Sequence, residues 1–202
     1  MSTDIADSSY PRECQNFPFP CANDKSRCMT REMFFLAMED ANRQFCDRYT
    51  GGSGGLNATK LSIYPFMQEI KDALFSSVTG RSRNKLTIFS GHDTVIAPVL
   101  AALGVYRQKQ MCVWPPYASR IAFEVYVRKS HDLNGTNVIY DEQRARELVM
   151  VRVLYNGKDI TSDIVHCKKS AEDGLCPLGA IENLVNSLIS PHSSIEEACE
   201  HL

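Results

Sequence analysis

The feature that most constrains the fold of this chain is a short apolar run, followed by a polar turn and a second apolar run. Leu86–Ser90 has the length and composition of a buried strand. Gly91-His92-Asp93-Thr94 follows, and Val95–Leu103 then shows the pattern of an apolar helix. A strand, a tight turn and a helix in this order indicate an α/β fold. Ligands of open α/β sheets bind beyond the carboxyl ends of strands, so His92 and Asp93 stand where chemistry is expected.

The first 80 residues predict a small helical lobe with a cysteine-rich segment. Apolar residues recur at helical spacing in 30–49 and again in 64–78, where Pro65 fits the first turn. We expect the apolar positions of residues 33–45 to be core, and Gly51–Gly55 to form a flexible turn between the two helices. The Pro- and Cys-rich residues 9–28 predict an irregular, cross-linked loop.

Residues 81–202 predict the α/β body. Two alternating stretches, 120–128 and 147–155, indicate strands. Asn156-Gly157 predicts a tight hairpin turn, with 159–161 as the returning strand. The polar residues 129–146 predict a surface loop, and 177–189 a closing helix with Pro177 in its first turn.

Eight cysteines and two glycosylation sequons favour an oxidising, secretory compartment over the cytosol. The sequons begin at Asn57 and Asn134. A structural zinc site is the alternative, because three cysteines recur at seven-residue spacing, but zinc ligands usually occur in pairs two to four residues apart. We therefore expect no metal. The cysteines are Cys14, Cys21, Cys28, Cys46, Cys112, Cys167, Cys176 and Cys199.

Two disulfide predictions follow from the positions of the cysteines. Cys167 and Cys176 close a short, mostly polar loop before Pro177, a layout that suits a local disulfide. We also expect Cys112 and Cys199 each to pair with a cysteine of the first 46 residues.

Charge and hydropathy argue against two classes of partner. The formal net charge is −2, which gives no reason to expect a nucleic acid or an anionic membrane as partner. The polar segment 1–7 is not a signal peptide, and no apolar stretch has the length needed to span a bilayer. We expect this secretory sequence to be incomplete, with a membrane anchor only if a preceding segment carries one.

The position of His92 and Asp93 suits a specific chemistry, the binding of an anion and the donation of a proton. A helix N-terminus offers N–H groups and partial positive charge to an anion, and a protonated His92 donates to phosphate oxygens. Asp93 would protonate a leaving oxygen. The alternative is structural: Asp93 or Thr94 caps the helix, and His92 is a packed polar residue.

Four blocks of this sequence resemble the histidine acid phosphatases, branch 2 of the histidine phosphatase superfamily. They are Phe89–Val105 with its His-Asp-Thr, Trp114–Glu124 with its Pro-Pro-Tyr-Ala-Ser, Val151–Gly157, and a Cys176-Pro177 block before the helix that bears Leu184. Their order and spacing fit the family over about residues 84–202. In the second block, Trp114 and the two prolines that follow it are expected only to fix a turn.

The resemblance implies a fold, a reaction and residue roles. The fold would be the C-terminal part of a three-layer α/β/α core, with an incomplete sheet and a small helical lobe. The reaction would be hydrolysis of a phosphomonoester substrate through a phosphohistidine intermediate. His92 would bind the phosphate, Asp93 would be the general acid, and no metal or organic cofactor is implied.

The sequence departs from the family in one respect. The family's nucleophile is the His of an Arg-His-Gly motif, which occurs nowhere in these 202 residues. The other histidines are expected at the surface, so the chain alone is expected to be inactive. A non-catalytic truncated or pseudo-enzyme form that keeps part of the phosphate site is the alternative. These histidines are His131, His166, His192 and His201.

Two features are similar to the 2-phosphoxylose phosphatase branch of this family: the cysteines around Phe19-Pro20-Cys21 in the first 80 residues, and the late Ala198-Cys199. This similarity implies a sugar phosphate of the glycosaminoglycan–protein linkage region as substrate. A generic phosphomonoester and an inositol phosphate stay open. The expected location is the Golgi lumen, the lysosome or the extracellular space.

Overall fold

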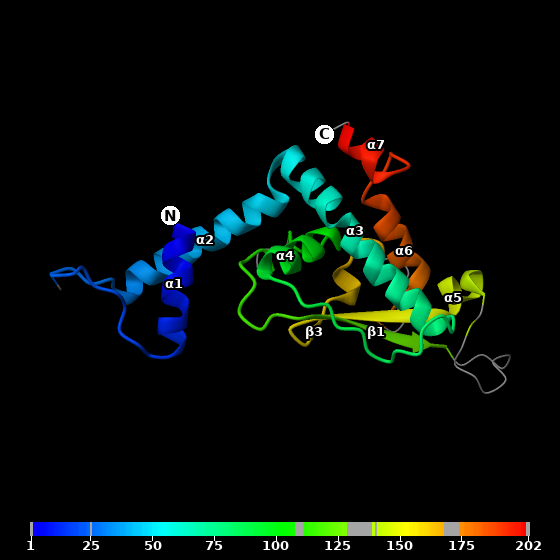
Figure 1. Cartoon of the computed structure of the whole chain (residues 1–202), viewed down its shortest axis with the longest axis horizontal. Helices are drawn as coiled ribbons and strands as arrows, with labels where there is room; N and C mark the ends of the chain where they lie inside the picture. Colours follow the sequence, from blue (N-terminus) through cyan, green and yellow to red (C-terminus); the bar gives the residue numbers. More distant parts are fainter. Residues whose placement is uncertain are drawn as a thin grey trace.

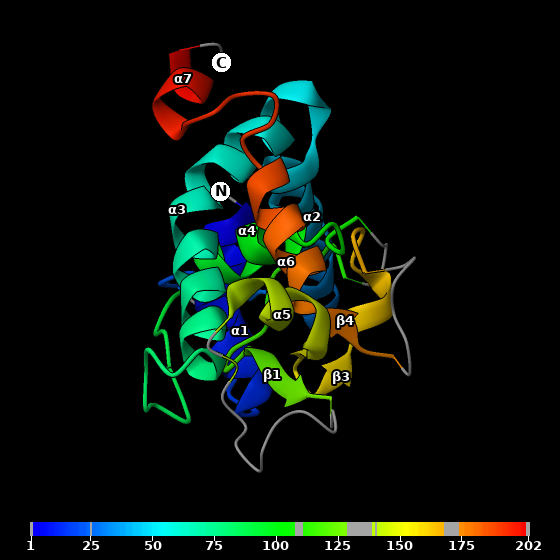
Figure 2. The same ribbon diagram turned by 90° about the vertical axis from the view of Figure 1, so that its right-hand side faces the viewer.

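A computed structural model describes residues 2–24, 26–107, 111–128, 139, 141–167 and 174–200 of the chain. It is a mixed α/β structure with a small, open antiparallel sheet. Helices α3 (Gly52–Val78), α4 (Asp93–Ala102) and α6 (Leu178–Ser187) lie on one side of the sheet, as Figures 1 and 2 show. The predicted α/β class is therefore confirmed.

The sheet is built around β2 (Val149–Tyr155). On one edge β2 pairs with β1 (Ile121–Val127), and on the other it pairs with two short strands, β3 (Lys158–Asp159) and β4 (Cys176–Pro177). All pairs are antiparallel. Both long strands and the hairpin after β2 were predicted from the sequence.

The two faces of the sheet differ in polarity, because side chains alternate along each strand. Phe123 lies opposite Val153 on the face that joins the apolar core. On the other face, Arg152 forms an ion pair with Glu124 at 3.5 Å, and its guanidinium lies 5.1 Å from the ring centre of Tyr126. The apolar face therefore fixes the register that brings β1 and β2 under the helices.

Helix α2 (Arg31–Thr50) is the predicted first helix, and Thr30 caps it by accepting the Met33 N–H at 3.2 Å. The predicted glycine turn is wrong, because α3 already begins at Gly52 and Pro65 lies inside it. Leu61 and Ile63 are buried in the segment between these two positions. Their packing overrides the low helix propensity of the glycines.

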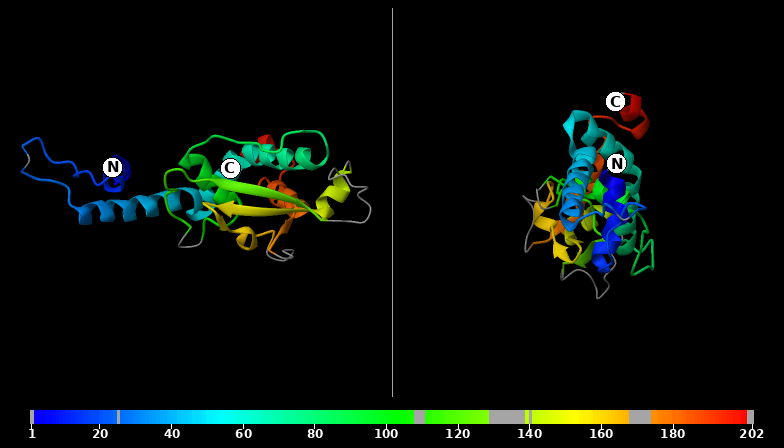
Figure 3. Two further views of the ribbon diagram at one scale, coloured as in Figure 1. Left: turned by 90° about the horizontal axis from the view of Figure 1, so that it is seen from below. Right: turned by 90° about the vertical axis from the view of Figure 1, so that its left-hand side faces the viewer.

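The N-terminal region is also more helical than predicted. Residues 9–28 were expected to be a loop, but α1 (Ser2–Cys14) covers the first of them and packs on α2, with Ala6 and Ser9 buried. Figure 3 shows α1 and the first part of α2 projecting from the body. On this projection Phe34 is buried, whereas Met33, which was predicted to be core, is 55% exposed.

One buried cluster joins the helices to the sheet. It contains Phe45 and Met67 from the first 80 residues together with Leu100, Val151 and Leu184 from the rest. The core therefore runs across the predicted domain boundary at residue 80. Burial of such side chains contributes about 1.5–3 kcal/mol each.

The predicted strand at Leu86–Ser90 is not formed. This segment has no regular secondary structure, and Leu86 and Ile88 are 75% and 78% exposed. A central strand needs partners for its N–H and C=O groups. Within the part of the chain that the structure describes, no strand pairs with it, nor with the outer edge of β1.

The remaining helices are α5 (Glu142–Leu148) and α7 (Ile195–Glu200). Helix α5 lies partly in the predicted loop 129–146, of which residues 129–138 and 140 are outside the described part. Asp141 caps α5 by accepting the Arg144 N–H at 3.0 Å. Arg146 then donates to both carboxylate oxygens of Glu182 on α6, which lowers the pKa of Glu182 through these hydrogen bonds. This pair fixes α5 against α6.

Three disulfides are present in the described residues. Cys167–Cys176 is the predicted local pair, and Cys46–Cys112 agrees with the prediction that Cys112 pairs with a cysteine of the first 46 residues. The prediction for Cys199 is wrong, because its thiol is free and exposed on α7. Helix α7 packs on α3, whereas Cys14, the other free cysteine, lies on α1 (Figure 1).

The third disulfide, Cys21–Cys28, closes a loop between α1 and α2. It uses two of the three cysteines that were considered as zinc ligands, so this disulfide argues against a zinc site there. Among the described helices, none has both the length and the apolar composition that crossing a bilayer requires.

We expect the Cys46–Cys112 disulfide to stabilise the fold more than the Cys21–Cys28 disulfide. The two cross-links span 66 and 7 residues, which corresponds to about 4 and about 2 kcal/mol of lost chain entropy in the unfolded state. The measurement is urea unfolding of the Cys46→Ser/Cys112→Ser and Cys21→Ser/Cys28→Ser double variants without reductant. Equal losses of unfolding free energy would contradict this assignment.

Candidate active site

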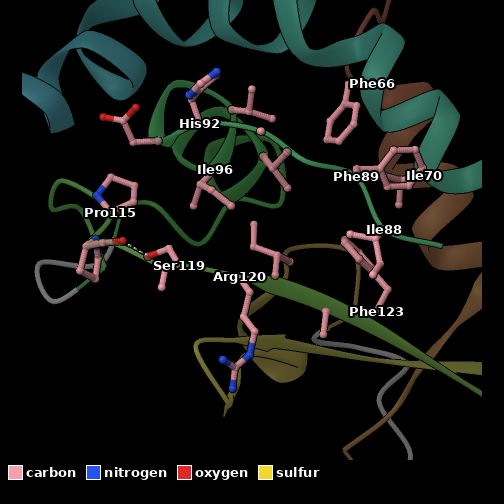
Figure 4. Close-up of a pocket in the computed structure, with 18 of the residues that line it drawn as sticks. Phe66, Ile70, Ile88, Phe89, His92, Ile96, Pro115, Ser119, Arg120 and Phe123 are labelled. Carbon is pink, nitrogen blue, oxygen red and sulfur yellow. Dashed lines mark hydrogen bonds between the residues drawn. The ribbon is translucent and has the colours of Figure 1, made fainter. Parts of the chain in front are cut away.

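A cleft of about 1420 Å³ lies between α3, α4, β1 and the extended segment 84–92. Its lining is mostly apolar, and Figure 4 shows Phe66 and Phe89 on one side and His92, Pro115 and Ser119 on the other. Phe66 and Phe89 meet edge to face, with ring centres 5.3 Å apart. A large, mostly apolar concavity with a few convergent polar groups is the usual form of a ligand site.

His92 and Asp93 both line this cleft, at the start of α4. The sequence analysis placed them at the end of a strand, and that strand is not formed. His92 is the N-cap residue in an extended conformation, and its carbonyl accepts the N–H groups of Val95 and Ile96 at 2.9 and 3.0 Å. Its side chain makes no capping hydrogen bond and is exposed. The backbone thus fixes the start of the helix, and the imidazole of this cleft residue is not used for capping.

The Asp93 carboxylate is held at both oxygens. Oδ1 accepts the backbone N–H of Thr94 at 2.9 Å, and Oδ2 accepts the indole N–H of Trp114 at 2.5 Å. The structural alternative for Asp93 is therefore partly realised, because its carboxylate does bind an N–H of the first helical turn. Each oxygen keeps a second lone pair, so this arrangement orients the carboxyl group without removing it from a ligand.

Trp114 was expected only to fix a turn, yet it positions Asp93. Its ring stacks on Phe45 of α2, with centres 5.6 Å apart and planes 15° apart. Its backbone N–H donates to Asn42 Oδ1 at 3.0 Å. Cys46 and Cys112, close in sequence to Phe45 and Trp114, are joined by a disulfide. A single tryptophan two residues after a cysteine was the only signal in the sequence for this role.

Two tyrosines, Tyr49 and Tyr106, lie close enough to Asp93 for its charge to act on them. The pKa of Tyr49 and the pKa of Tyr106 are raised, chiefly by burial and also by nearby charge that includes Asp93. Tyr106 donates its hydroxyl to the Val113 carbonyl at 2.6 Å. These hydroxyls therefore stay protonated near Asp93. The basic Arg120 also lines the cleft, but Figure 4 shows its guanidinium pointing away from His92.

The other predicted site residues lie elsewhere. The Cys167–Cys176 disulfide adjoins β4 and is structural. Asn57 is exposed on α3, and the hydroxyl of Thr59 in its sequon donates to the Gly55 carbonyl. Glycosylation of Asn57 stays a prediction, and Asn134 lies outside the described residues.

His166 and His192 do not line the cleft, and His131 and His201 lie outside the described part. Among the cleft residues that the structure describes, His92 is the one imidazole. No group of three or more His, Cys, Asp or Glu side chains within the described ranges has a metal-binding arrangement. The site thus offers one imidazole donor and one oriented carboxyl group, a set suited to binding an oxyanion and protonating an oxygen.

Comparisons with known proteins agree with the resemblance seen in the sequence. The family model described as histidine phosphatase superfamily (branch 2) matches residues 37–156, which include Trp114 as well as His92 and Asp93. No solved structure matches the chain.

Several curated proteins are similar to the chain. The 2-phosphoxylose phosphatase 1 of Xenopus tropicalis is 27% identical over 89% of this chain and 32% of its own length. Counting factor 60 of Dictyostelium discoideum is 23% identical over 98% of the chain and 38% of its own length. Lysophosphatidic acid phosphatase type 6 of Mus musculus is 27% identical over 63% of the chain and 25% of its own length. The chain thus spans about a third of the length of the first two relatives.

Removal of the Asp93 carboxylate should loosen Trp114. In Asp93→Ala the indole N–H loses its acceptor, so we expect the emission of Trp114, the single tryptophan, to be quenched more strongly by acrylamide. Asp72→Ala is the control, because Asp72 is exposed on α3 outside the cleft. Identical quenching constants for Asp93→Ala and the unmodified chain would mean that the hydrogen bond does not hold Trp114.

Proposed function

Because the chain belongs to branch 2 of the histidine phosphatase superfamily, we propose that it supplies a phosphate ligand and the general acid of a phosphomonoesterase. One observation carries this proposal: His92 and Asp93 lie side by side at the start of α4 and line one cleft, inside the region that the family model matches. The hydrolase class is supported by the printed names of the relatives.

In the proposed reaction, His92 binds the phosphoryl group. An imidazolium at the N-terminus of α4 adds a charged donor to the partial positive charge of the helix, and both stabilise phosphate oxygens. The structure supports this role in that the His92 side chain is exposed and is not used for capping.

Asp93 protonates the departing alcohol. Its carboxyl group is held by Thr94 and Trp114, so it keeps one orientation beside the phosphoryl group. Proton transfer by a positioned acid typically contributes ~10²–10⁴-fold to rate. The covalent step needs the Arg-His-Gly histidine that the resemblance implies, and these 202 residues do not contain that motif.

The proposed substrate is a sugar phosphate, with the secretory pathway as the location. Relatives named 2-phosphoxylose phosphatase 1 match 89% or more of this chain, whereas the lysophosphatidic acid phosphatase matches 63%. The three disulfides support an oxidising compartment.

A second candidate is a non-catalytic protein that keeps part of the phosphate site. The observation in its favour is that His92 is the one imidazole among the described cleft residues, so no second histidine faces it as a nucleophile.

Inorganic phosphate should bind to the chain and change the emission of Trp114, because Trp114 contacts Asp93. His92→Ala should weaken binding by about tenfold or more, the effect of losing one charged hydrogen bond. The control is His192→Ala, since His192 lies 3.8 Å from Glu197 and outside the cleft. Equal affinities of the His92→Ala variant and the unmodified chain for inorganic phosphate would refute the proposed phosphate site.

Hydrolysis tests whether the 202-residue chain is an enzyme by itself. We expect the homogeneous, monomeric 202-residue chain to release no phosphate from para-nitrophenyl phosphate and to form no phosphohistidine, because it lacks the Arg-His-Gly nucleophile. Dose-dependent turnover that Asp93→Asn reduces would overturn this expectation and make the chain an enzyme by itself.

A further inference from the structure

A tight turn ahead of β1 presents an exposed aromatic ring at the cleft. Tyr117 is 62% exposed, and the next residue, Ala118, has φ +59, in the left-handed region. Ser119 closes the turn, because its backbone N–H and its hydroxyl both donate to the Pro116 carbonyl, at 3.2 and 2.7 Å. Non-glycine residues in the left-handed region carry strain and are found often at ligand-binding sites.

The hairpin after β2 stabilises this turn through hydrogen bonds of Asn156. Asn156 accepts the Arg120 N–H at 2.9 Å through its side-chain oxygen, and its amide nitrogen donates to the Ser119 hydroxyl at 3.2 Å. The backbone on the C-terminal side of Tyr117 is thus fixed while its ring remains open to solvent. A rigid support under an exposed aromatic side chain lowers the entropy cost of binding a ligand.

Helix α1 contributes Asp7 and Tyr10, which contact Tyr117; these three residues form one wall of the cleft. The ring of Tyr10 meets that of Tyr117 edge to face, with centres 5.3 Å apart, and the Tyr117 hydroxyl donates to Asp7 Oδ1 at 3.1 Å. All three residues line the cleft that contains His92 and Asp93. The pKa of Tyr117 is raised by desolvation, by the bond to Asp7 and by negative charge that includes Asp93. The charge of Asp93 therefore acts on Tyr117.

We propose that Asp7, Tyr10 and Tyr117 form the subsite for the alcohol part of the phosphomonoester, and that this alcohol is a neutral, hydroxylated ring such as a sugar. The inference rests on the proposed function, in which the phosphoryl group binds at His92. A tyrosine ring offers an apolar face to the C–H side of a sugar ring. Asp7 accepts hydrogen bonds from sugar hydroxyls, as ionised carboxylates do.

Charge at the wall narrows the substrate class further. Asp7 places negative charge beside Tyr117 in the cleft. Additional phosphate groups on the alcohol would be repelled there. An inositol polyphosphate is therefore disfavoured relative to a sugar that carries one phosphate.

The test compares two ligands, inorganic phosphate and xylose 2-phosphate, by titration of Trp114 emission in the full 202-residue chain. Tyr117→Ala should weaken xylose 2-phosphate about tenfold more than phosphate, since it removes the stacking surface. Tyr117→Phe should keep most of the affinity, because the ring remains. Tyr126→Ala is the matched control, an exposed tyrosine on the polar face of β1 outside the cleft.

Each remaining outcome has a defined meaning. Equal weakening of both ligands by Tyr117→Ala, or of neither, would overturn the subsite and leave the phosphate site of the proposed function standing. Failure of the unmodified chain to bind inorganic phosphate would refute the proposed function and the subsite with it. Tighter binding of an oleoyl lysophosphatidic acid, unaffected by Tyr117→Ala, would assign the alcohol to the apolar side of the cleft and overturn the sugar subsite.

Discussion

The candidate site depends on the attachment of Trp114 to α2. Phe45 stacks on the indole and Asn42 accepts the backbone N–H of Trp114, while the Cys46–Cys112 disulfide ties the chain to α2 two residues earlier. Trp114 in turn donates to Asp93, so the orientation of a carboxyl group at the start of α4 is set by a helix some 50 residues earlier in the sequence. Such support by neighbouring residues is what keeps a catalytic group within reach of its substrate.

His92 is positioned differently. It follows the extended segment 84–91, which is not hydrogen-bonded into the sheet within the described residues, so the hydrogen bonds from Val95 and Ile96 to its carbonyl fix its backbone. The exposed side chains of Leu86 and Ile88 lie on the same segment. One half of the His-Asp pair is therefore rigidly supported, and the other depends on the first turn of α4. The wall of Asp7, Tyr10 and Tyr117 borders the same cleft and is supported from α1 and from the β2–β3 hairpin.

Local patterns predicted the parts of the fold that local physics controls. The α2 and α4 helices, the hairpin at Asn156 and the place of His92 beside Asp93 follow from periodicity, turn residues and caps. Long-range packing decided the rest: buried Leu61 and Ile63 made a helix of the glycine run, and Leu86–Ser90 is not a strand because a strand is defined by its neighbours. The role of Trp114 depends on contacts 72 residues apart in sequence, which no local pattern contains.

The central claim is that His92 is the phosphate ligand of this chain. The most direct measurement is NMR of the chain with ¹⁵N-labelled histidine side chains, titrated with inorganic phosphate at constant pH. The account predicts that of the five histidines the His92 ring signals alone move saturably, and that these shifts disappear in His92→Ala. Phosphate-dependent shifts at His166 or His192 with none at His92 would contradict it.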